Sequence, residues 1–131
     1  MKTDSSTNCS NAVSWETIKY FTKEELDCKH SGQNEMQQEF MEKLDELRIA
    51  CGFPFVITSG YRSSDHPAEA SKATKGGTHT LGIAADIGVS NGSQRRTIVA
   101  EALNLGFTGI GVAKGFVHVD TRDSTPVMWT Y

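Results

Sequence analysis

The chain has 131 residues and a mass of 14.3 kDa, which fits one domain built around a single hydrophobic core. Hydrophobic residues make up 37% and charged residues 22% of the sequence, as in ordinary globular proteins. A formal net charge of -3 provides no overall positive field, which excludes binding to nucleic acid by bulk electrostatics, and we expect no nucleic-acid partner.

Neither a membrane span nor a secretory signal is expected. No segment approaches the run of about 20 apolar residues that a transmembrane helix requires, and residues 1–11 are polar without an apolar centre. The three cysteines, Cys9, Cys28 and Cys51, are odd in number and form no CxxC pair. We therefore expect no disulfide framework and synthesis in a reducing cytoplasm.

The first half of the chain predicts helices. Residues 1–13 are rich in Ser, Thr and Asn and are expected to be a flexible N-terminus, leaving 14–131 as a single domain. Thr22, followed three residues later by Glu25, fits a capping box that opens a short helix. An apolar stripe at helical spacing predicts a longer helix over 35–51, ended by Gly52. The stripe consists of Met36, Phe40, Leu44, Leu47 and Cys51.

The second half predicts mainly strands. Short apolar runs at 55–58 and 83–89 indicate buried strands, and the runs at 108–112 and 116–120 indicate a hairpin. A brief helix is expected near 68–72, and a longer helix capped by Ser93 and ended by Gly106 lies between the strands. Residues 121–128 are expected to form a loop. The order predicts an α+β domain with a small, mostly antiparallel sheet and flanking helices.

Three residues stand out as candidate metal ligands. His79 follows a double-glycine loop, Asp86 lies inside an apolar strand, and His118 is flanked by valines in another strand. A carboxylate in such a strand is costly unless it is paired or binds a cation. Two imidazoles and one carboxylate suit zinc and leave a fourth position open, as in catalytic sites. The spacing alone leaves a satisfied core histidine and a turn-capping aspartate as alternatives.

Three sequence blocks narrow these alternatives. SGYRS, THTLGIAAD and HVD occur in the order found in the zinc DD-peptidases, and the likeness covers roughly residues 20–131. The chain thus resembles D-Ala-D-Ala carboxypeptidases and phage cell-wall endopeptidases, which share the hedgehog/DD-peptidase fold. The resemblance implies that one zinc ion is held by His79, Asp86 and His118. It also implies that Arg62 binds substrate near the metal and that Thr78, before the first ligand, contacts the substrate or orients the loop.

The general base is harder to assign from the sequence. Better-known relatives carry an acidic residue three positions before the last histidine ligand, where this chain has Gly115. Asp120 is the local candidate, because residues two apart on a strand face the same side. Its alternative role is to orient a ligand or Arg62. Asp123 and Glu69 are weaker candidates for the base.

The function implied by the resemblance is zinc-dependent hydrolysis of peptide bonds in bacterial peptidoglycan, by a carboxypeptidase or endopeptidase. We expect a phage-encoded lysin, made in the host cytoplasm and reaching the cell wall at lysis or in a phage particle. Its partners would be peptidoglycan peptides, and we expect a monomer. The alternatives are an inactive zinc-binding recognition module of the same fold and a structural component of a phage particle. The aromatic residues Trp129 and Tyr131 are expected to line the cleft or to pack in the core.

Overall fold

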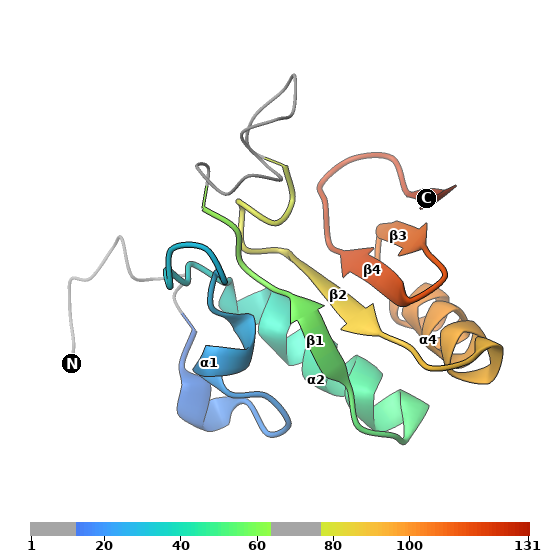
Figure 1. Ribbon diagram of the computed structural model, residues 1–131, viewed down its shortest axis with the longest axis horizontal. Coiled ribbons are helices and arrows are strands. Elements are labelled where there is room, and N and C mark those ends of the chain that lie inside the picture. Colours follow the sequence, from blue (N-terminus) through green and yellow to red (C-terminus); the bar gives the residue numbers. More distant parts are fainter. Residues whose placement is uncertain (1–12, 64–76) are drawn as a thin grey trace.

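A five-stranded sheet and three α-helices make up most of the part of the chain described by the computed structural model, residues 13–63 and 77–131 (Figure 1). The elements in chain order are the 3₁₀ helix η2 (Trp15–Thr17), α1 (Lys23–Leu26), α2 (Gln38–Cys51), β1 (Val56–Ser59), β2 (Ala84–Gly88), α4 (Gly92–Leu105), β3 (Gly109–Val112), β4 (Phe116–Asp120) and β5 (Val127–Thr130).

The strands lie in the order β1-β2-β4-β3-β5. Neighbouring strands pair antiparallel except for β3 and β5, which run parallel. The predicted α+β domain with a mostly antiparallel sheet is therefore confirmed. The prediction of a loop over 121–128 is wrong at its end, because β5 begins at Val127 and forms one edge of the sheet.

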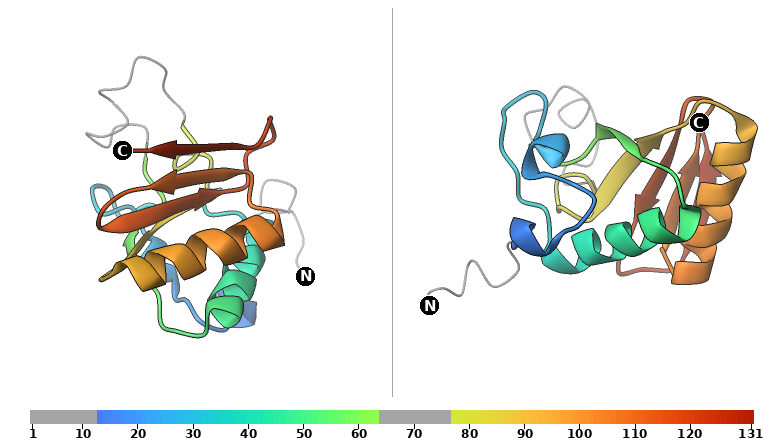
Figure 2. Two further views of the ribbon diagram at one scale, coloured as in Figure 1. Left: turned by 90° about the vertical axis from the view of Figure 1, so that its right-hand side faces the viewer. Right: turned by 90° about the horizontal axis from the view of Figure 1, so that it is seen from below.

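The two faces of the sheet have different environments. Helices α2 and α4 lie on the same side of the sheet (Figures 1 and 2), and the apolar residues of the central strands belong to the core that they share with these helices. These strand residues are Ala85, Ile87, Ile110, Val117 and Val119. Because side chains alternate along a strand, the residues between them point to the opposite face. That face carries Asp86 on β2, and His118 and Asp120 on β4.

The helix boundaries follow local signals in the sequence, with one exception. The Glu25 side chain accepts a hydrogen bond from the backbone N–H of Thr22, as the predicted capping box requires, and Gly52 ends α2 with a left-handed φ of 77°. The prediction that Ser93 caps α4 is wrong. Asn91 is the N-cap, and its side chain accepts from the backbone N–H of Gln94 at 2.9 Å.

Two of the sequence predictions lie wholly or mainly outside the described residues: the brief helix near 68–72 and the flexible terminus over 1–13. None of the helices in the described ranges is long and apolar enough to cross a membrane.

Candidate metal centre

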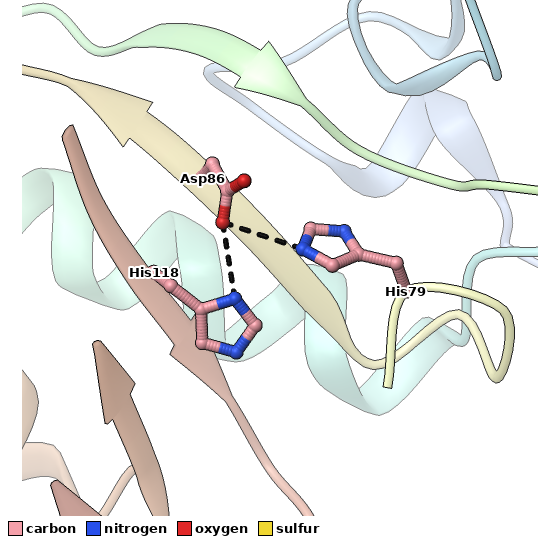
Figure 3. A group of neighbouring side chains, drawn as sticks. All are labelled: His79, Asp86 and His118. Carbon is pink, nitrogen blue, oxygen red and sulfur yellow. Dashed lines mark hydrogen bonds and ion pairs between the residues drawn. The ribbon is translucent and has the colours of Figure 1, made fainter. Parts of the chain in front are cut away.

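His79, Asp86 and His118 meet on the sheet face that the helices leave uncovered. Asp86 and His118 are direct partners in the β2–β4 ladder, and His79 comes from the loop before β2. Oδ1 of Asp86 lies 3.3 Å from Nε2 of His79 and 3.0 Å from Nδ1 of His118 (Figure 3). The structure therefore brings together the three side chains that the sequence singled out as ligands.

The donor atoms of this cluster fit a tetrahedral zinc ion. One ligand atom from each residue lies within 4.8 Å of the other two, and all three residues are buried. Zinc bonds of about 2.0–2.2 Å in tetrahedral geometry place two ligand atoms about 3.3–3.6 Å apart. The separation of 3.3 Å between Asp86 and His79 lies in this range, and the separation of 3.0 Å between Asp86 and His118 is slightly shorter. Two nitrogens and one oxygen leave a fourth position for water or substrate, which is the arrangement of a catalytic site rather than a structural one.

In each imidazole, the outer nitrogen, which is the one that does not contact Asp86, has its own hydrogen-bond acceptor. Nδ1 of His79 lies 2.8 Å from the carbonyl oxygen of Gly60, and Nε2 of His118 lies 2.7 Å from Oδ2 of Asp120. When these outer nitrogens carry the protons, the inner nitrogens present lone pairs to a metal. His79 would then bind through Nε2 and His118 through Nδ1.

Gly60 is placed for this task by a close backbone contact. A Cβ at this position would lie 2.7 Å from the backbone of Leu26, at the end of α1. The next residue, Tyr61, donates its backbone N–H to the Leu26 carbonyl at 2.8 Å. Since a larger residue would push the chain away from α1, the glycine keeps its carbonyl oxygen within reach of His79.

The cluster has a strong electrostatic character. Burial alone would raise the pKa of Asp86, but hydrogen bonds and charge interactions with the two imidazoles hold that pKa well below its usual range. Burial alone would lower the pKa of His118, whereas its contacts with Asp120 and Asp86 raise the pKa above the usual value. Asp86 is thus ionised at neutral pH, and a proton on His118 would compete with a metal ion.

A cleft of about 490 Å³ opens beside the cluster. Arg62 and Thr78, the predicted substrate-binding residues, both line it. Nε of Arg62 donates to Ser59 Oγ at 3.0 Å, and one of its terminal nitrogens lies 3.4 Å from Oδ2 of Asp86. The full lining is Arg62, Gly77, Thr78, His79, Leu81, Asp86, Phe116, His118, Arg122, Trp129 and Tyr131.

Aromatic side chains form one wall of the cleft. The ring centroids of Phe116 and Tyr131 are 4.9 Å apart, and those of His118 and Trp129 are 5.0 Å apart. Of the two places expected for Trp129 and Tyr131, cleft or core, the structure therefore shows the cleft.

The candidate bases lie in different surroundings. Asp120 is fully buried and is not among the residues that line the cleft. Asp123 is exposed in the segment between β4 and β5, and Glu69 lies outside the described residues. Within the described ranges, the only acidic residue lining the cleft is Asp86, which belongs to the ligand cluster.

Arg122 is a site residue that the sequence did not reveal. It lines the cleft, contacts the buried Asp120 through its guanidinium at 2.7 Å, and lies over the Trp129 ring at 5.0 Å from the centroid. The spacing of the sequence could have indicated this role. Arg122 follows Asp120 by two residues, as Asp120 follows His118, and residues two apart on an extended chain point to the same side.

Comparison with known proteins adds one result. A family model described as Peptidase M15 matches residues 19–120, which is most of the chain and includes all three cluster residues. The match ends before β5, so Trp129 and Tyr131 lie beyond it. No curated protein sequence matches the chain.

Proposed function

The chain belongs to the Peptidase M15 family of zinc-dependent metallopeptidases, and on this premise we propose that it hydrolyses peptide bonds in bacterial peptidoglycan. The observation that carries the proposal is the buried cluster of His79, Asp86 and His118 in the wall of a cleft large enough for several peptide atoms. The chemistry that a bound zinc ion supplies there is Lewis-acid activation of a carbonyl group and of water.

The residues around the cluster have distinct roles in this proposal. Arg62 binds a carboxylate or carbonyl of the substrate, because a guanidinium offers a planar set of donors and this one lies beside the ligand Asp86. Thr78 lies in the cleft next to the ligand His79 and contacts the bound peptide. The aromatic wall excludes water from one side of the substrate, which strengthens the polar interactions inside the cleft.

The charges of the cleft favour a peptide with free carboxylates. Two cationic side chains, Arg62 and Arg122, line it, and Asp86 is the one acidic lining residue in the described ranges, although Arg122 also pairs with the buried Asp120. A zinc ion adds further positive charge. Stem peptides of peptidoglycan carry free carboxylates, so they complement this surface. Leu81 and Phe116 add apolar surface for short aliphatic side chains.

We further propose that the protein is a phage-encoded lysin that reaches the wall at cell lysis. Both carboxypeptidase and endopeptidase cleavage are compatible with an open cleft beside the cluster. The two differ in whether the substrate continues past the scissile bond, and the cleavage products distinguish them.

A second candidate function is a zinc-binding recognition module that does not cut. It is favoured by Gly115, which occupies the position where an acidic residue was expected, and by the lack of a further acidic lining residue in the described part of the cleft. Hydrolysis needs a group that takes a proton from the attacking water.

Mass spectrometry of purified peptidoglycan fragments, after incubation with the zinc-loaded protein, tests the two functions against each other. The peptidase predicts new fragments whose masses name the cleaved bond. His79→Ala should abolish them, and His30→Ala, a change at an exposed histidine that does not line the cleft, should leave them unchanged. If zinc is bound and fragments from several wall types stay intact, the recognition module is correct and the peptidase is not.

A further inference from the structure

The buried carboxylate of Asp120 makes contacts that suit a supporting role at the metal centre. We propose that Asp120 and Arg122 form a positioning pair that fixes the ring of His118, so that Nδ1 of the ring faces the metal. Asp120 is then a positioning residue rather than the group that takes a proton from water, and Arg122 is a further functional residue. The inference rests on the proposed zinc function, because it concerns how a ligand is held.

The first argument is that both oxygens of Asp120 are already occupied. Oδ1 accepts from the backbone N–H and from Nε of Arg122, both at 3.0 Å. Oδ2 accepts from Nε2 of His118 and from a terminal nitrogen of Arg122, both at 2.7 Å. The residue is 0% exposed. A carboxylate that transfers protons must reach the attacking water directly or through one water, and this one is not among the residues that line the cleft.

The second argument is that the fold provides a space for this carboxylate. Gly109 is the partner of Asp120 in the β3–β4 ladder, and a Cβ on Gly109 would overlap both carboxylate oxygens. Gly111, the partner of His118, likewise leaves room for the Trp129 ring, since a Cβ there would lie 2.7 Å from the indole. Two glycines on β3 thus make room for the groups that surround the His118 ring.

The third argument concerns the ring itself. A neutral imidazole carries one N–H, and the hydrogen bond made by one nitrogen decides whether the other can bind a metal. With Nε2–H donated to Asp120, Nδ1 keeps its lone pair on the side of Asp86, where a metal ion would be bound. Arg122 compensates the buried negative charge of Asp120, which would otherwise be strongly destabilising. Trp129 packs against both Arg122 and His118 and limits rotation of the ring.

The experiment measures zinc affinity by competition with a chromophoric chelator. Asp120→Ala, Asp120→Asn and Arg122→Ala are compared with the wild-type protein and with Asp123→Asn, a matched change at an exposed acid nearby. The inference predicts that zinc binding weakens about 10- to 100-fold in the first three variants, as for other residues that orient metal ligands. Asp123→Asn should bind zinc as the wild type does.

Asparagine is informative because it keeps the shape of aspartate. In one orientation its amide nitrogen would face Nε2 of His118 and would favour a proton on Nδ1, which blocks metal binding. In the other orientation the amide nitrogen would face the backbone N–H and Nε of Arg122. These groups are donors too, so their hydrogen bonds to residue 120 would be lost. Both orientations predict weaker zinc binding.

Two further readouts separate positioning from proton transfer. Imidazole ¹⁵N NMR of the zinc-loaded wild-type protein should show His118 with its proton on Nε2 and its metal bond through Nδ1, a test that needs no variant to fold. Hydrolysis by Asp120→Ala should recover in part at saturating zinc. Unchanged zinc affinity in Asp120→Ala combined with lost hydrolysis at saturating zinc would overturn the inference and make Asp120 the base. A proton on Nδ1 in the wild type would also overturn it, and a wild type that binds no zinc would contradict the proposed function as well.

Discussion

Gly109 lies directly opposite Asp120 in the β3–β4 ladder, and the side chain that it lacks leaves the space occupied by the Asp120 carboxylate. We therefore expect Gly109→Ala to lower the free energy of unfolding by about 1–3 kcal/mol, the usual cost of overpacking. It should also weaken zinc binding, because the displaced carboxylate no longer holds His118. Urea denaturation and chelator competition measure the two effects.

Gly115→Ala is the matched control for this prediction. A Cβ at Gly115, in the β3–β4 turn, would meet no atom within 4 Å. The substitution should leave zinc affinity unchanged and alter stability by less than about 0.5 kcal/mol. Equal effects of the two substitutions would show that the space beside Asp120 matters neither for zinc affinity nor for the free energy of unfolding.

Asp86→Asn should weaken zinc binding strongly while it preserves the shape of the ligand, because a neutral amide replaces the ionised ligand between the two histidines. Asp45→Asn is a control in α2, where a buried carboxylate accepts from the backbone N–H groups of Lys19 and Tyr20. That variant should lose stability and keep its zinc affinity. Zinc content after dialysis, measured by atomic absorption, and thermal melting distinguish the two.

The zinc-free protein should lose stability as the pH rises from neutrality. Folding raises the pKa of His118 above its value of 6.5 in model compounds, through the contacts with Asp120 and Asp86 that outweigh burial. A raised pKa contributes stability that is fully present below about pH 6.5 and is lost as the pH passes through the folded value. Urea midpoints of the zinc-free protein between pH 6 and 9 should therefore fall, and His118→Ala should flatten this dependence.

The zinc-loaded protein should not show this fall, because the two effects of pH on His118 cancel. Protons compete with the metal for His118, so bound zinc contributes more stability as the pH rises through the same range. A zinc-loaded midpoint that falls in parallel with that of the zinc-free protein would argue against His118 as a ligand.

Asn91→Ala should lower the free energy of unfolding by about 1 kcal/mol, the typical effect of losing a helix N-cap. The Asn91 side chain accepts from the backbone N–H of Gln94 at the start of α4. Ser93→Ala is the matched control, because Ser93 lies inside the first turn and its side chain caps nothing. Comparable losses in both variants would mean that the hydrogen bond to Gln94 contributes little.

Much of the local structure could be predicted from the sequence because its signals are short-range. The 3.6-residue period of the apolar stripe predicted α2, and alternating or continuous apolar runs predicted four of the strands. The prediction of Ser93 as the cap failed, since Asn and Ser both cap well and only the backbone conformation shows that Asn91 takes this position. The family inferred from the three sequence blocks is confirmed by the match over residues 19–120. The roles of the individual site residues stay predictions.

The surroundings of the site could not be predicted, because they depend on which strands become neighbours. Strand periodicity placed Asp120 on the same face as His118, and this is correct. It could not show that Gly109 on another strand would create the space beside it, or that Arg122 would occupy both of its oxygens. β5 was missed for the same reason: its edge position leaves most of its residues exposed, so it lacks the buried apolar pattern of the other strands.

The pairing of Asp86 with His118 across β2 and β4 has a consequence for how metal binding relates to folding. These side chains are brought face to face by backbone hydrogen bonds between interior strands, and His79 is held by the Gly60 carbonyl. Most of the conformational entropy of the ligands is therefore lost when the sheet assembles, before any ion arrives. Such a preorganised site differs from that of a zinc finger, whose chain is unfolded without its metal. A chelator should extract zinc from this domain and leave its cooperative unfolding transition in place at a lower midpoint.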